Sequence, residues 1–126
     1  MHAKGVRITG ARITGKLDLE ETKITFPLVL ILCHVEQPIT LGGAETKSLV
    51  FRGSHIPSID GQQIKTTGNV YLDGVTSTKG GVSLAGAEIS GRLVCVNATF
   101  ANENPGGFAF DILNARVEGI FFWMPA

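Results

Sequence analysis

Two histidines of this chain have a spacing that could place them at one metal site. His34 and His55 lie 21 residues apart, and Arg12 lies 22 residues before His34. If the chain repeats with that period, the two imidazoles stack on one outer surface about 5 Å apart, where they could share a metal ion. The corresponding later positions are Thr76 and Thr99, so this row contains no third ligand. We therefore predict a solvated row and no metal site.

Acidic side chains could provide the pair of carboxylates that some right-handed β-helix enzymes use to cleave glycosides. The acidic residues considered for this role are Asp60, Asp73, Glu88, Glu103 and Asp111. Nothing in the sequence places two of them in one outward row beside an Arg or Lys. A carbohydrate-active β-helix enzyme is therefore kept only as an alternative.

Ser54, His55 and Asp60 contain the side-chain types of a hydrolase triad. The chain has no G-x-S-x-G nucleophile elbow, and neighbours in a strand point to opposite faces, which separates the Ser54 hydroxyl from the His55 imidazole. Ser54 is expected to fill a small inward position. The glycine pairs at 80–81 and 106–107 are expected at corners, because no G-x-G-x-x-G pattern accompanies them. We predict no catalytic residue and no cofactor.

The composition is that of a folded β protein without a net electrostatic field. Of the 126 residues, 44% are hydrophobic and 17% are charged, and 11 basic residues balance 11 acidic ones. This length fits one domain, and zero net charge gives no support to binding of nucleic acid or an acidic membrane. Sixteen glycines among many Val, Ile, Leu and Thr residues favour short strands and tight turns over helices.

The two cysteines and the apolar runs indicate the compartment. Cys33 and Cys95 have no CxxC spacing and no His partner at metal-ligand spacing, so we predict buried free thiols in a reducing compartment. Residues 1–5 lead into alternating polar and apolar residues, unlike a signal peptide. The longest apolar run, residues 26–33, is far shorter than the ~20 residues of a membrane-spanning helix. We expect a cytoplasmic protein that does not insert into membranes.

The elements that must position these side chains are repeats of 21–23 residues. Each repeat contains pairs of small or apolar residues at i and i+2, so each pair marks a short strand with one face inside. The alternation breaks every five or six residues, and the chain must bend at each break. The repeats begin at Ala11, Cys33, Ser54, Val75 and Ala98. The pattern predicts an all-β fold, a right-handed parallel β-helix of about five four-sided turns.

Stacking the turns aligns residues of similar type in inward columns, as a solenoid core requires. One column is Leu28, Leu49, Val70, Leu93 and Phe121. A second is Leu30, Phe51, Leu72, Cys95 and Trp123. We expect a single domain over residues 1–126, with an insertion at residues 101–113 in the last turn. A partner is expected to contact six outward side chains: Arg12, His34, His55, Asn102, Glu103 and Asn104.

The units A-x-[ILV]-x-G-x-L-x-L resemble those of pentapeptide-repeat proteins, which are right-handed quadrilateral β-helices. One unit spans residues 11–19, and another, with Cys at its last position, spans residues 87–95. The resemblance covers nearly the whole chain and implies a bacterial protein, although the sides here alternate five and six residues where the family keeps five. It implies no catalytic residues. Some family members mimic duplex DNA with a strongly negative face, which this chain could form only if its charges segregate.

The combined pattern predicts a non-enzymatic scaffold or protein-interaction module with an unknown protein partner. An alternative, similar to the bactofilins, is a filament formed by end-to-end stacking, because an open solenoid exposes strand edges at both ends. The last residues, 120–126, are an apolar run. That end is expected either to stack on another copy or to be the cut edge of a longer protein.

Substitutions in the first repeat test the assignment of inward and outward positions. Leu17 is predicted to lie in the core and Lys16 outside it. Leu17→Asp is expected to unfold the solenoid because it buries an unpaired carboxylate, whereas Lys16→Ala is expected to change stability by less than about 0.5 kcal/mol. Urea denaturation followed by circular dichroism measures both, and equal stabilities of the two variants would refute the assignment.

Overall fold

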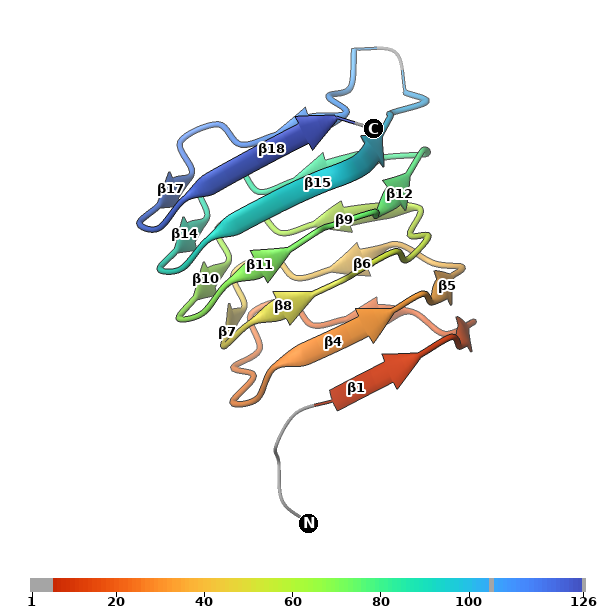
Figure 1. Cartoon of the computed structure of the whole chain (residues 1–126), viewed down its shortest axis with the longest axis horizontal. Helices are drawn as coiled ribbons and strands as arrows, with labels where there is room; N and C mark the ends of the chain where they lie inside the picture. Colours follow the sequence, from red (N-terminus) through yellow and green to blue (C-terminus); the bar gives the residue numbers. More distant parts are fainter. Residues whose placement is uncertain (1–5, 105, 126) are drawn as a thin grey trace.

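The structure is a computed structural model that describes residues 6–104 and 106–125. Within these residues the chain forms strands β1 to β18 and no helix. The strands stack in parallel as a β-solenoid of about four turns (Figure 1). This confirms the predicted all-β parallel solenoid, and the number of turns is close to the five expected.

Each turn has four sides, which we call sides A to D. Side A contains β1 (Val6–Thr9), β4 (Leu28–Ile31), β8 (Leu49–Val50), β11 (Val70–Tyr71), the start of β15 (Leu93–Phe100) and β18 (Phe121–Pro125). Side B contains β2 (Arg12–Ile13), β5 (His34–Val35), β12 (Thr76–Ser77) and the end of β15. Side C contains β3 (Leu17–Asp18), β6 (Ile39–Thr40), β9 (Ser58–Asp60), β13 (Gly81–Ser83) and β16 (Phe110–Asp111). Side D contains β7 (Glu45–Thr46), β10 (Lys65–Thr66), β14 (Glu88–Ile89) and β17 (Arg116–Val117).

The residues predicted to begin the turns lie at equivalent positions in successive turns. Backbone pairing joins the residues that follow them into one row: Arg12, His34, His55, Thr76 and Thr99. The predicted column from Leu28 to Phe121 is continuous as well. Since the named strands all pair in parallel, each turn supplies the hydrogen-bond partners of the next.

The inward columns form one apolar core along the axis of the solenoid. Its largest fully buried side chain is Phe51. Ser54 fills a buried inward position, as predicted, where its hydroxyl donates to the Leu30 carbonyl at 3.1 Å and accepts from the Cys33 N–H at 3.1 Å. Leu17 is only partly buried, whereas Ile39, its neighbour in the same column, is fully buried. The core is therefore less protected at its first turn than in its middle.

Two corners of every turn require left-handed backbone, with φ between +53° and +70°. The corner after side A has Gly10, Leu32, Gly53, Gly74 and Asn97. The corner before side D has Glu21, Gly43, Gln63, Gly86 and Asn114. Glycine and asparagine adopt this conformation at the lowest cost, which explains why they recur at these positions of the repeat.

The segment outside the stack is shorter than the insertion expected at residues 101–113. Within that range, β16 pairs in parallel with β13, so that Phe110 lies beside Val82 on side C. Phe110 and Ile112 pack against the core. The segment outside the stack therefore ends before Phe110. The sequence did not reveal this side because the loop before it breaks the spacing of the repeat.

Leu32 is the one aliphatic residue at these left-handed corners, and it is 65% exposed. Replacement by Asn, which occupies the equivalent corner at Asn97, is expected to raise the free energy of unfolding by about 0.5–1 kcal/mol by relieving backbone strain. Asn97→Leu is expected to lower it by a similar amount. Urea denaturation of both variants checks this. A loss of stability in Leu32→Asn would mean that the leucine side chain contributes more than the strain costs.

Candidate functional site

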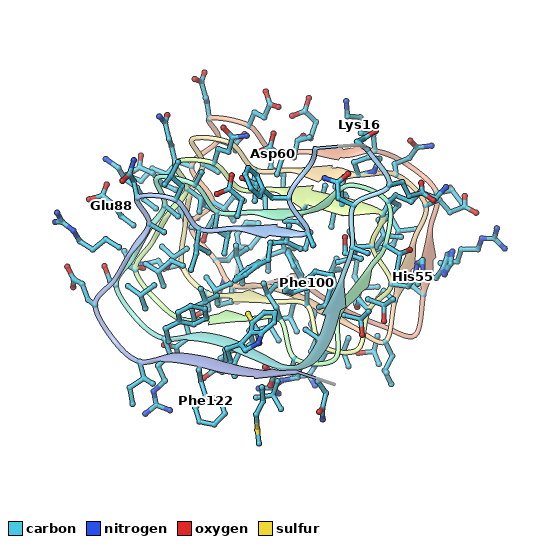
Figure 2. All side chains as sticks on the ribbon, turned by 90° about the horizontal axis from the view of Figure 1, so that it is seen from above. Lys16, His55, Asp60, Glu88, Phe100 and Phe122 are labelled. Carbon is cyan, nitrogen blue, oxygen red and sulfur yellow. The ribbon has the colours of Figure 1, made fainter. Side chains whose placement is uncertain are left out.

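The outward side chains of sides B, C and D form polar rows, and those of side A form mainly apolar ones. Each row contains one residue from each successive turn. Figure 2, which looks along the stack, shows His55 on side B, Asp60 on side C, Glu88 on side D and Phe122 pointing outward from side A. A partner meeting this protein therefore encounters four chemically different faces.

On side B the two histidines stack as predicted. The ring centroids of His34 and His55 are 4.9 Å apart and the rings are nearly parallel, at 9°. Arg12, one turn earlier, forms an ion pair with the carboxylate of Glu36. Among residues 6–104 and 106–125, no group of three or more His, Cys, Asp or Glu side chains is placed to hold a metal ion.

Residues of the loop that follows side B serve mainly to hold that loop in place. The side-chain amide of Asn102 donates to the carbonyls of Gly80 and Phe108, each at 3.1 Å, and its oxygen accepts from the Asn104 N–H at 2.8 Å. The side chains of Glu103 and Asn104 are exposed and border a shallow groove that also includes Glu36. The structure thus brings part of the predicted contact surface together through Glu36, the partner of Arg12.

Side C aligns two of the acidic residues considered above, Asp60 and Asp111, in one outward row that contains no Arg or Lys. The row is Asp18, Thr40, Asp60, Ser83 and Asp111. Successive carboxylates are two strands, or about 10 Å, apart, and no Arg or Lys separates them in the row. The Glu20 N–H and the Thr40 hydroxyl donate to Asp18, at 3.2 and 3.0 Å, and lower the pKa of its carboxyl.

Side D alternates in charge along its outward row. The row is Lys23, Glu45, Lys65, Glu88 and Arg116. Lys65 Nζ lies 3.7 Å from Glu88 Oε2. Because the signs alternate at every turn, this face has no negative stripe of the kind that a DNA mimic requires.

Side A differs from the other three faces because apolar side chains dominate its two outward rows, which Figure 1 views face on. The first row is Arg7, Val29, Val50, Tyr71, Val94 and Phe122. The second is Thr9, Ile31, Arg52, Asp73, Val96 and Met124. This face was not predicted from the sequence. Its signal was the apolar residue between the two inward members of each side-A pair, such as Val29 between Leu28 and Leu30.

Charged groups lie at the centre of side A. The Arg52 guanidinium lies 5.0 Å from the centroid of the Tyr71 ring, and its Nε is 3.7 Å from Asp73 Oδ2. That separation is too long for a hydrogen bond. The guanidinium donates no hydrogen bond to any residue that the structure describes. Its donors are therefore available to another molecule.

The last turn exposes aromatic side chains at inward positions. Phe100 and Trp123 both stack near Phe110, with ring centroids 5.1 and 5.2 Å from it, and Phe121 lies 6.3 Å from the same ring. Trp123, the only tryptophan of the chain, is 43% exposed. These four rings form an apolar platform that covers the C-terminal end of the core.

Comparison of the chain with protein-family models, with curated proteins and with solved structures gives no match. In the part of the chain that the structure describes, no helix has the length and apolarity needed to cross a membrane. The fold and the surface chemistry therefore carry the functional argument.

Both cysteines are buried and free, as predicted. Burial, and secondarily the negative charge of Asp73, raises the pKa of the Cys95 thiol to about 12. Since the thiolate is the nucleophile, Cys95 is expected to resist alkylation by iodoacetamide at about pH 8 in the native protein and to react once the chain is unfolded. Mass spectrometry of native and guanidinium-treated protein measures this. Modification of Cys95 in the native protein would contradict its burial.

Proposed function

We propose that this protein is a rigid, non-enzymatic scaffold that binds another protein through the outward face of side A. The observation that supports this proposal is the difference in side-chain chemistry between side A and the other three sides. Sides B, C and D present charged and hydroxyl-bearing rows to solvent, whereas seven of the twelve outward residues of side A are Val, Ile, Phe or Met. A contiguous apolar area with polar groups at few positions is typical of a protein-interaction site.

The polar residues of side A also support recognition of protein. Tyr71 and Arg52 stand together at the centre of the face, and Tyr and Arg are enriched among residues that dominate binding energy. The sheet behind them is anchored by parallel pairing on both sides, so little conformational entropy is lost when a partner binds. The face therefore combines apolar area, anchoring side chains and rigidity.

The repeat units resemble those of pentapeptide-repeat proteins, and this resemblance supports a family assignment. We assign the chain to a divergent, pentapeptide-repeat-like group of bacterial origin. The free, buried cysteines favour a reducing compartment such as the cytoplasm. The stacked histidines and the loop residues Glu103 and Asn104 are secondary contact candidates, because they lie outside side A.

A filament built by end-to-end stacking is the second candidate, favoured by the exposed aromatic platform at the last turn. The outward rows oppose it. Side A has one strand more than sides C and D, so β1 of a second copy stacked on β18 would leave a gap of one rung on the other sides. Across that gap, Asp111 would be nearest to Asp18 and Arg116 nearest to Lys23, about 10 Å apart. The gap and the like charges beside it favour the scaffold.

Affinity capture with matched variants tests the binding face. Wild type, Val94→Lys on side A and Thr76→Lys on side B are immobilised and exposed to a lysate of the source cell. Both positions are outward and half-buried, so the folding cost of each lysine is comparable. We expect a protein bound by wild type and Thr76→Lys to be reduced at least tenfold on Val94→Lys, as mass spectrometry would quantify.

Circular dichroism and thermal unfolding of the three proteins provide the folding control. Proteins captured equally by all three, or lost only with Thr76→Lys, would refute side A as the binding face.

A further inference from the structure

We propose that the partner of side A is a second copy of this chain, bound face to face about a two-fold axis. This inference rests on the proposed function, because it takes side A as the binding face and names its partner. The axis is parallel to the strands and passes midway between β8 and β11, the two central strands of the face (Figure 1). Such an interface is closed and involves the same surface on both copies.

The symmetry places opposite charges together at the centre of the interface. Rotation about this axis reverses the order of the strands but keeps each position along a strand, so β8 of one copy faces β11 of the other. Arg52 on the β8 turn then faces Asp73 of the second copy, and Asp73 faces Arg52 of that copy. The side chains of Arg52 and Asp73 are 51% and 31% exposed. The free donors of the guanidinium can therefore reach the facing carboxylate.

The remaining positions of side A are compatible with the same rotation. Val29 faces Val94, Ile31 faces Val96, and Val50 faces Tyr71 of the second copy. These pairs bury apolar surface between two sheets about 10 Å apart, as in a β-sandwich. At the edge, Arg7 faces Phe122 of the second copy, a pairing suited to a cation–π contact. Among the described residues of this face, no pair of like charges meets.

The other faces lack the apolar rows of side A. On side D, a two-fold axis through the middle strand β10 would place Lys65 against Lys65 of the second copy, whereas an axis midway between β7 and β10 would place Glu45 against Lys65. The charges of side D could therefore pair, but little apolar surface would be buried there. On side C, an axis through β9 would place Asp60 against Asp60. Among the sides that the structure describes, side A alone combines two mainly apolar rows with a self-complementary charge pair at its centre.

The size of the face indicates how tightly the copies bind. The face is six strands wide, at about 4.8 Å per strand, and about four residues long, as in β1 and β4, so it covers roughly 24 by 13 Å. This area is smaller than the ~800 Å² per partner of a standard stable interface. We therefore expect a reversible dimer whose fraction rises with protein concentration, and not a permanent one.

A charge-exchange experiment tests the pairing. Sedimentation velocity is run over a concentration series on wild type, Arg52→Asp, Asp73→Arg and an equimolar mixture of the two variants. In each variant alone, the central pairs have like charge, so its dimerisation constant is expected to fall at least tenfold below that of wild type. In a mixed dimer, the two carboxylates of the Arg52→Asp copy face the two guanidinium groups of the Asp73→Arg copy. Both central contacts are then attractive, and dimers are expected to return.

A control variant, circular dichroism and tryptophan emission distinguish this dimer from misfolding and from end-to-end stacking. Arg116→Asp changes an exposed charge on side D and is expected to leave dimerisation unchanged, and circular dichroism confirms that each variant folds. Trp123 points inward at the C-terminal end and not into side A, so its emission is expected to stay constant as dimers form. Growth beyond two copies accompanied by a blue shift of this emission would indicate end stacking and overturn the proposal.

The experiments distinguish failure of the dimer proposal from failure of side A as a binding face. A wild type that remains monomeric at every concentration, or a mixture that fails to associate, overturns the second copy as partner. If side-A-dependent capture of a different protein persists in that case, the proposed function still stands. If the captured protein is this chain itself and the mixture restores binding, both are supported.

Discussion

Parallel backbone pairing between the same sides of successive turns is the constraint on which the rest of this structure depends. Each short strand is too brief to be stable alone, but each turn satisfies the N–H and C=O groups of the next. The pairing holds every turn in one register. Side chains separated by a full turn in sequence become direct neighbours, inside the core as columns and outside it as rows.

Because each outward row contains the same position of every turn, the chemistry of a whole face depends on only one or two positions of the repeat. Val29, Val50 and Val94 make side A apolar, while Lys23, Glu45 and Lys65 make side D a ladder of alternating charge. A solenoid can therefore present different surfaces on its sides without any change to its core. Because the surface residues can change while the core stays the same, this fold is suited to binding other molecules.

Sequence reasoning succeeded where the signal was local. The i and i+2 pairs located the inward positions, and the repeat period correctly placed His34 beside His55 and Ser54 inside. It was wrong about the extent of the insertion, since a loop interrupts the spacing before Phe110 rejoins side C. It also missed the alignment of Asp60 with Asp111 beyond that loop. The apolar face of side A was missed because an outward apolar residue between two inward ones, such as Val29, cannot be told from a core residue by its type alone.

The sequence by itself determined the inward and outward positions and the length of the turn, because alternation and period are properties of residues close together in the chain. Only the tertiary structure decided which outward residues stand next to one another. That adjacency depends on the register between strands of neighbouring turns and on where a loop rejoins the stack. The meeting of Arg52 with Tyr71 and Asp73 at the centre of side A is a product of that register.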